Sequence, residues 1–114
     1  MKKSSNCIFC NIIADKSKAA IIYEDEKVAA FPDISPQAPV HILVVPKEHY
    51  ATLNDTPGGV AGQCVDAARK IAEEKGIDRA GYRIVINCND DGGQAVGHLH
   101  IHLLGGRKMK WPPG

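Results

Sequence analysis

The residues best suited to chemistry are three histidines that alternate with apolar residues near the end of the chain: His98, His100 and His102. In a β-strand, residues two apart lie on the same face, about 6–7 Å from each other. The spacing therefore predicts three imidazoles on one face of a strand, with the apolar residues between them packed on the other. A solvent-facing polar stripe is the plain structural alternative. Because the stripe holds three of the chain's five histidines, a functional site is favoured.

Two kinds of chemistry suit such a stripe. A His-x-His pair on a strand can chelate zinc, with a third ligand completing a catalytic site. Alternatively, one imidazole is a nucleophile and its neighbours polarise an anionic substrate. The preceding loop favours the second interpretation, because Gly92, Gly93 and Gln94 can present backbone N–H groups to phosphate oxygens without obstruction by side chains. A glycine pair alone is typical of ordinary turns, so the loop is informative only together with the histidines.

Cys7 and Cys10 form a Cys-x-x-Cys pair in the first turn of a predicted N-terminal helix. A redox site of this pattern needs a βαβ context, which the sequence does not predict. The pair is therefore either a metal site or two semi-buried thiols. Cys64, on the apolar side of a helix, and Cys88, at the end of a strand, are expected to be core residues. Since no secretion signal accompanies the four cysteines, disulfides are not expected.

The elements that position these residues follow from apolar periodicity, prolines and glycines. A helix over residues 6–15 has Asn6 as its candidate N-cap, and a long helix over residues 57–75 ends at Gly76. The predicted strands cover residues 21–23, 28–31, 40–45, 82–88 and 98–104, with a proline-rich loop at 32–39 and a turn-rich loop at 89–97. The order α-β-β-β-α-β-β predicts an α+β domain with an antiparallel sheet and its helices on one face.

Length and charge limit the function classes. A chain of 114 residues is expected to form one domain with a modest stability margin, which dimerisation would increase. The net charge of +1, with acidic and basic residues interspersed, argues against nucleic acid as a partner. No secretion signal or stretch of transmembrane length is found, so we expect no membrane association and a cytoplasmic location, with the nucleus added for a eukaryotic source.

The segment HLHIHLL at 98–104 resembles the histidine triad pattern, His-φ-His-φ-His-φ-φ with φ apolar, of the HIT superfamily. The resemblance covers nearly the whole chain and is to the histidine triad nucleotide-binding (HINT) branch, through FPDISPQAP at 31–39, HILVVPK at 41–47, DGGQ at 91–94 and LGGRKMKWPPG at 104–114. It implies a HIT-like fold: an antiparallel five-stranded sheet, one long and one short helix, and a sheet that extends across a homodimer. Residues 1–114 would be a single HIT domain, with 1–6 a flexible N-terminus and 107–114 a C-terminal tail.

The resemblance implies a hydrolase that cleaves the P–N bond of purine nucleoside 5′-phosphoramidates, such as adenosine 5′-monophosphoramidate. His100 would attack the α-phosphorus, His102 would donate to the phosphate oxygens, and water would then hydrolyse the nucleotidyl-histidine intermediate, with no metal required. One alternative is a nucleotide-binding regulatory or scaffolding protein with weak or vestigial hydrolase activity. It is motivated by Ala95, where many family members carry a hydroxyl residue. The other alternative is a metal-dependent hydrolase that uses the triad as ligands.

The resemblance also assigns the nucleotide contacts. The ligand would be a purine nucleotide of the AMP or GMP type. Asp33 would accept both ribose hydroxyls, and Ile34 would border the ribose and the base. The other assigned contacts are Phe9, His41 and Leu43 at the base, Asn87 and the backbone of Gly93, Gln94 and Ala95 at the phosphate, and His98, His100, Ile101 and His102 from the triad segment. From the residues alone, a turn-capping role for Asp33 and a structural role for His41 and Asn87 are equally open.

Two further assignments come from the resemblance. A Cys₂His₂ set would bind a structural zinc, because four protein ligands leave no open position. Its members are Cys7, Cys10, His49 and His98. Trp111, in the tail, would reach toward the active site of the partner subunit, and packing on its own subunit is the alternative.

Overall fold

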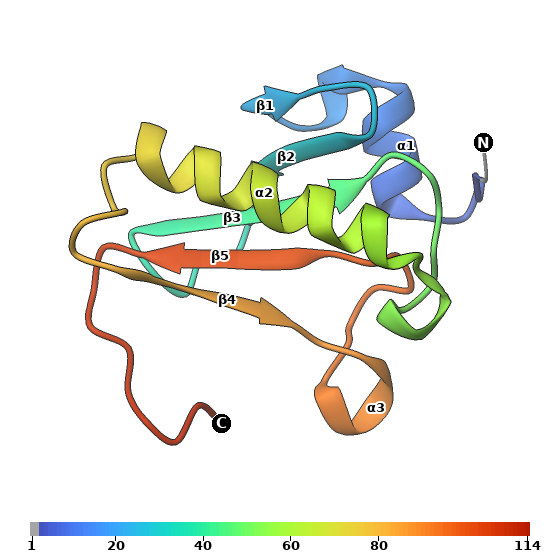
Figure 1. Ribbon diagram of the computed structural model, residues 1–114. Helices are drawn as coiled ribbons and strands as arrows, with labels where there is room; N and C mark the ends of the chain where they lie inside the picture. The colour runs from blue at the N-terminus through green and yellow to red at the C-terminus, as the bar shows by residue number, and fades with distance from the viewer. Residues whose placement is uncertain (1–2) are drawn as a thin grey trace.

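A five-stranded antiparallel sheet organises residues 3–114, which are the residues that the computed structural model describes (Figure 1). The strand order is β1-β2-β3-β5-β4, so β3 lies at the centre and β1 and β4 lie at the edges. The strands are β1 (Tyr23–Glu24), β2 (Val28–Pro32), β3 (Val40–Pro46), β4 (Tyr82–Ile86) and β5 (Ile101–Gly105). The predicted α+β class and the five antiparallel strands are confirmed.

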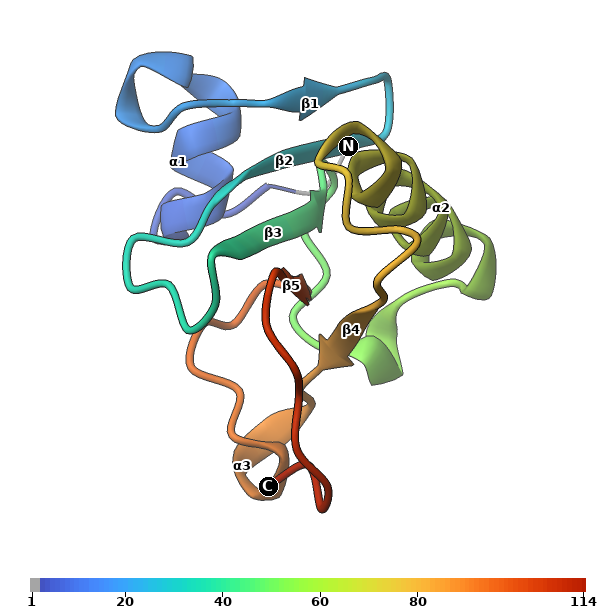
Figure 2. The same ribbon diagram turned by 90° about the vertical axis from the view of Figure 1, so that its left-hand side faces the viewer.

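The two main helices lie on opposite faces of this sheet, with α1 (Ile8–Ala14) on one face and α2 (Gly58–Glu74) on the other (Figures 1 and 2). The prediction that the helices share one face is therefore wrong. The reason is that β2 and β3 are continuous apolar runs, which are typical of strands buried on both faces. Their residues alternate between the α2 core (Val28, Ala30, Ile42, Val44) and the α1 core (Ala29, Phe31, Leu43, Val45).

The ends of the helices agree only partly with the sequence analysis. Gly76 follows α2 with φ +71°, a left-handed conformation that glycine adopts without strain, as predicted. The N-cap of α1 is Cys7 rather than Asn6, because the Cys7 Sγ accepts the Cys10 N–H at 3.4 Å. Among residues 3–114, no helix is long and apolar enough to cross a membrane.

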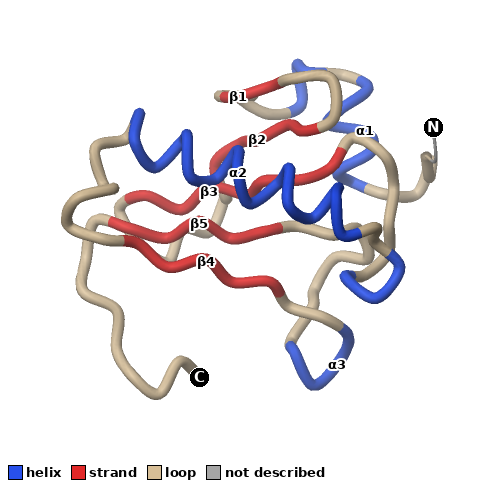
Figure 3. The backbone as a smooth tube through the Cα atoms, in the orientation of Figure 1, coloured by secondary structure: helices blue, strands red, loops and turns tan. Residues whose placement is uncertain are grey.

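The strand that contains the histidine segment begins later in the sequence than predicted. β5 begins at Ile101, so His98 and His100 precede the strand and only His102 lies within it. The alternation nevertheless holds from His100 onward, since Ile101 and Leu103 pack in the α2 core while His100 and His102 line a cavity on the other face. The 89–97 loop, predicted without regular structure, contains a one-turn helix, α3 (Asn89–Gly92), beyond the end of β4 (Figure 3).

Candidate active site

A cavity of about 290 Å³ lies on the α1 face of the sheet, between α1, the ends of β2 and β3, and the 89–97 loop. Nine of the predicted nucleotide contacts line it: Phe9, Asp33, Ile34, Leu43, Asn87, Gly93, Ala95, His100 and His102. The lining residues that the sequence analysis did not assign are Ile8, Ile12, Phe31, Pro32 and Val96. Helical spacing from Phe9 was a usable indication for Ile12, because residues three apart share a helix face.

The backbone orients His100. Its Nδ1 lies 2.8 Å from the carbonyl oxygen of His98, and since a carbonyl only accepts, Nδ1 carries the hydrogen. The lone pair is then on Nε2, which is the nucleophilic atom of this tautomer. The ring is 6% exposed, lines the cavity and meets the ring of Phe9 edge-on, with centroids 5.2 Å apart. The arrangement holds one defined imidazole tautomer at the polar end of the cavity.

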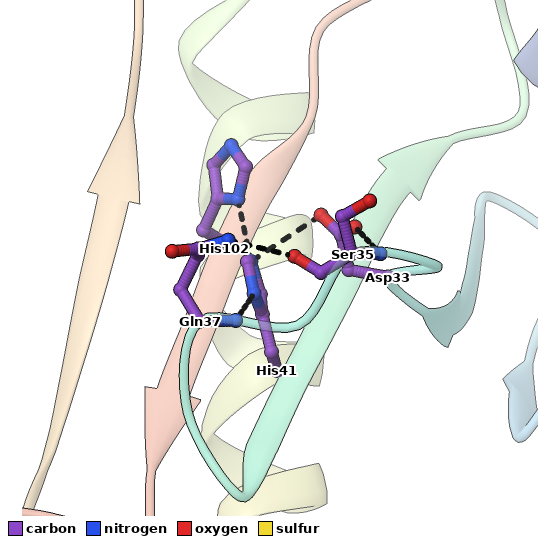
Figure 4. A network of polar contacts seen from close by, with 5 residues as sticks. All are labelled: Asp33, Ser35, Gln37, His41 and His102. Atoms are coloured by element: carbon purple, nitrogen blue, oxygen red, sulfur yellow. Dashed lines mark hydrogen bonds and ion pairs between the residues drawn. The ribbon is translucent and has the colours of Figure 1, made fainter.

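A chain of hydrogen bonds places the hydrogen of His102 on Nε2, the opposite ring nitrogen from that of His100. The Gln37 backbone N–H donates to Nδ1 of His41 at 2.9 Å, so His41 carries its hydrogen on Nε2. That Nε2 lies 2.9 Å from Nδ1 of His102 and 3.4 Å from a carboxylate oxygen of Asp33 (Figure 4). His102 therefore accepts at Nδ1 and keeps its own hydrogen on Nε2. Neutral His102 is a hydrogen-bond donor beside His100, whose ring centroid is 5.0 Å away.

Burial keeps both of these rings neutral. It lowers the pKa of His102 to about 4, and the nearby His100 and His41 act in the same direction. Burial also lowers the pKa of His41, against the opposing effect of Asp33. Near pH 7 the hydrogen-bond chain therefore runs between uncharged imidazoles.

Asp33, His41 and His102 also place three potential metal-ligating atoms within 4.8 Å of one another. The hydrogen-bond pattern argues against a metal there. Since Nδ1 of His41 already accepts the Gln37 N–H, ligation through Nε2 would require an imidazolate. The trio is better described as a hydrogen-bond chain.

Asp33 combines two of the roles considered from the sequence. One carboxylate oxygen accepts the Ser35 N–H at 2.8 Å, which is a turn-capping bond, and the other faces His41. The side chain is 18% exposed and lines the cavity, so it is accessible to a ligand as well. The neighbouring Ile34 is 97% exposed at the cavity edge, where an apolar ligand surface would cover it.

The 89–97 loop differs from the predicted phosphate nest. The Gly93 N–H donates to the Asp90 carbonyl at 3.0 Å and the Gln94 N–H to the Asn89 carbonyl at 3.1 Å, so both are consumed in ending α3. In the part of the chain that the structure describes, the Ala95 N–H has no acceptor. Of the predicted backbone donors in this loop, Gly93 and Gln94 are therefore engaged within the protein and the Ala95 N–H is not. The one-turn helix whose end Gly93 and Gln94 close has no indication in the sequence.

Cys7, Cys10, His49 and His98 form a compact cluster next to the cavity, with ligand atoms all within 4.8 Å of one another. The two Nδ1 atoms are 3.1 Å apart, and three sulfur–nitrogen distances are 3.3, 3.3 and 3.5 Å. Around a tetrahedral zinc, ordinary bond lengths give N–N edges of about 3.3 Å and N–S edges of about 3.5 Å. The cluster therefore has the dimensions of a Cys₂His₂ zinc site.

The surroundings of His98 support ligation. Its Nε2 lies 2.8 Å from the Pro46 carbonyl, so Nε2 carries the hydrogen and Nδ1 offers a lone pair to the cluster. Burial lowers the pKa of His98 to about 4, which keeps the ring in the neutral form that a metal needs. These four residues fit a structural zinc, with no position left for substrate.

The HIT domain model matches residues 14–109. The chain belongs to the HIT domain family. It is 47% identical over 105 residues to the purine nucleoside phosphoramidase of Escherichia coli, which covers 90% of this chain and 88% of that protein. It is 44% identical over 115 residues to the 14 kDa zinc-binding protein of Zea mays, which covers 96% and 89%. A HIT family hydrolase from Legionella pneumophila superposes with a TM-score of 0.91 at 46% identity, covering 96% of this chain and all of that one.

Five residues assigned to nucleotide binding do not line the cavity of this HIT domain. His41 lies behind His102, His98 faces the cysteines, and the side chain of Ile101 is buried in the α2 core. Gln94 is half-buried beside Ala51. Trp111 is 81% exposed, and its ring contacts Arg83 of the same chain, whose guanidinium carbon lies 5.9 Å from the ring centroid.

Proposed function

We propose that this HIT domain hydrolyses the P–N bond of purine nucleoside 5′-phosphoramidates through a nucleotidyl-His100 intermediate. The observation that carries the proposal is the tautomer of His100, whose Nδ1–H is held by the His98 carbonyl so that Nε2 is the nucleophile. The Escherichia coli relative is named a purine nucleoside phosphoramidase, which agrees with this choice of substrate class.

In the proposed reaction, Nε2 of His100 forms a bond to the α-phosphorus as the P–N bond breaks. The amine leaves with the electron pair of that bond and takes up a proton from solvent, which is returned when water attacks in the second step. The positive charge on the modified imidazole is stabilised by the Nδ1–H bond to the His98 carbonyl, and the Nε2–H of His102 donates to the phosphoryl oxygens. Water then attacks the phosphorus and releases the nucleoside monophosphate and free His100.

The cavity supplies groups for the rest of a purine nucleotide. Phe9 and Leu43 offer an apolar surface for the base, with Ile34 at the edge, and the Asp33 carboxylate is placed to accept ribose hydroxyls. Asn87 and Ala95 line the same cavity as the two histidines, and the phosphate would bind among these residues with the Ala95 N–H as a backbone donor.

The test is turnover of a fluorogenic adenosine phosphoramidate, with AMP binding measured by calorimetry. We expect wild-type protein to turn over substrate, and His100→Ala to lose turnover while still binding AMP, since its contacts with base and ribose are intact. A His100→Ala variant that keeps most of its kcat would refute the assignment. AMP binding without turnover would favour the regulatory alternative, which Ala95 motivates. Complete loss of activity in chelator would favour the metal-dependent alternative.

We also propose that the Cys₂His₂ cluster binds one structural zinc per chain. The distances within the cluster, the neutral His98 and the name of the Zea mays relative support this. Zinc there would tie α1 to the triad segment, and the chemistry at His100 needs no group from it. Elemental analysis of protein purified without chelator should find about one zinc per chain.

A homodimer that pairs β4 with β4 of a second copy is our proposal for the assembly. β4 is an edge strand of half-buried residues that include Ile84 and Ile86, and apolar edges of this kind favour pairing with another strand. Exposed Trp111 lies over Arg83 of the same strand, so the tail would run beside the interface toward the partner's site. Sedimentation at micromolar concentration should give a dimer, and truncation after Lys110 should alter KM or leaving-group preference without dissociating it.

A further inference from the structure

Gln94 has an unusually complete set of side-chain hydrogen bonds for a residue in a surface loop. Its Oε1 accepts the Asn89 N–H at 2.9 Å. Its Nε2 donates to the Ala51 carbonyl at 2.7 Å and to the Val96 carbonyl at 3.0 Å. Both amide hydrogens and the amide oxygen are therefore engaged.

These bonds join two segments that are far apart in the sequence. Ala51 belongs to residues 49–51, which are attached to the triad segment twice more: the Tyr50 carbonyl accepts the Leu99 N–H at 2.7 Å, and His49 contacts His98 in the cysteine–histidine cluster. Residues 49–51 are thus held in place against the triad segment. The Gln94 side-chain amide, through its bond to Ala51, holds the 89–97 loop at a set distance from them.

The same side chain also shapes the loop internally. Asn89 has φ +59° and is the only non-glycine residue with positive φ in the described part of the chain. The Asn89 N–H donates to the Gln94 side-chain oxygen, and the Asn89 carbonyl accepts the Gln94 N–H. Gln94 therefore binds both backbone polar groups of Asn89 and closes the turn. A conformation of this kind is costly for a side-chain-bearing residue and persists only where surrounding bonds hold it.

What Gln94 positions is the residue that follows it. Ala95 lines the cavity, has no polar side chain, and has a backbone N–H without an acceptor among residues 3–114. The location of that donor depends on the bonds that Gln94 makes on either side, to Asn89 and to Val96. We propose that Gln94 is a positioning residue that acts through Ala95. Its side chain, tied to Ala51, aims the Ala95 N–H at the phosphate of a bound nucleotide without touching that nucleotide itself. This rests on the proposed function.

Comparison of AMP with adenosine separates this role from a general contribution to folding, since the two ligands differ only in the phosphate. In calorimetric titrations, Gln94→Met should bind AMP about tenfold more weakly than wild type, the effect of losing one hydrogen bond to a charged group, and should bind adenosine as wild type does. Gln63→Met, the same substitution at an exposed position of α2, is the matched control and should bind both ligands normally.

Gln94→Asn keeps the amide but shortens the side chain by one methylene, so it provides a second variant should Gln94→Met fail to fold. The same selective loss of AMP affinity is expected. In addition, the Ala95 amide resonance should shift on AMP binding in wild type and not in either Gln94 variant. Unchanged AMP affinity in a folded variant, or equal losses for AMP and adenosine, would overturn the positioning role. A wild-type chain that binds neither ligand would overturn the proposed function and this role with it.

Discussion

Cys7→Ser isolates the metal site, because it removes a ligand while leaving the cap of α1 in place. The Cys7 Sγ accepts the Cys10 N–H as the N-cap, and serine is among the preferred residues for that position. What the substitution takes away is one of the four atoms in a cluster whose distances fit tetrahedral zinc. Any loss of stability that depends on zinc therefore reports on the cluster and not on the helix end.

The size of the effect follows from linkage. A metal that binds only the folded chain stabilises it by about 2.7 kcal/mol when free zinc exceeds the Kd a hundredfold. For a domain of 114 residues, 1 kcal/mol corresponds to about 3–6 °C in Tm. The Tm of the wild-type protein should therefore be about 8–16 °C higher in zinc than in chelator.

The assay is calorimetric melting of wild type, Cys7→Ser and Cys88→Ser, each with zinc and with chelator. Cys88 is half-buried and outside the cluster, so its variant is the matched control and should respond to zinc as wild type does. Cys7→Ser should melt at the same temperature in both conditions while keeping most of its turnover. The site would be refuted if the Tm of the wild-type protein were the same in zinc and in chelator. It would also be refuted if zinc raised the Tm of Cys7→Ser as much as that of the wild type.

Three other outcomes follow from the hydrogen-bond chain and the loop. His41→Phe removes the donor to Nδ1 of His102 and should lower kcat about 10–100-fold with little change in AMP affinity, and an unchanged kcat would contradict the assigned tautomers. Ala95→Ser should raise kcat/KM, because a hydroxyl at the cavity wall can donate to the phosphate in the transition state; an equal or lower value would mean the loop is arranged differently. In metal-free Cys7→Ser, the free energy of unfolding in urea should fall as the pH drops from 6.5 to about 4. In that pH range the His102 imidazole is protonated in the unfolded chain and neutral in the folded chain. A free energy of unfolding that does not change with pH would therefore argue against a buried neutral His102.

Local spacing was enough to predict the two faces of the triad segment, since the period of two placed Ile101 and Leu103 in the core on the side away from the cavity. The cysteine–histidine cluster needed more than spacing, because the grouping of the Cys-x-x-Cys pair with His49 and His98 came from the family resemblance. Periodicity did not predict the layer of α1, since a continuous apolar strand leaves open which helix covers each face.

Backbone partners from distant segments were beyond sequence reasoning, because a carbonyl or an N–H has no residue type of its own. The Pro46 carbonyl, 52 residues from His98, is one example, and the Tyr50 carbonyl that accepts the Leu99 N–H is another. The assignment of His41 to the base pocket illustrates the consequence. Its place behind His102 depends on the pairing of β3 with β5, in which His41 lies opposite Leu104 and His102 lies two positions along, opposite Leu43.

These backbone partners give three similar histidines three different roles. His98 donates from Nε2 to Pro46, so Nδ1 faces the cysteines; His100 donates from Nδ1 to His98, so its lone pair is on Nε2. His102 accepts at Nδ1 from His41, so Nε2 remains a donor. His98 also connects the two sites, because its ring belongs to the cluster while its carbonyl holds the His100 ring. Fixing the His98 ring fixes the peptide that sets the His100 tautomer, so the proposed structural zinc and the proposed reaction can depend on one residue without sharing an atom.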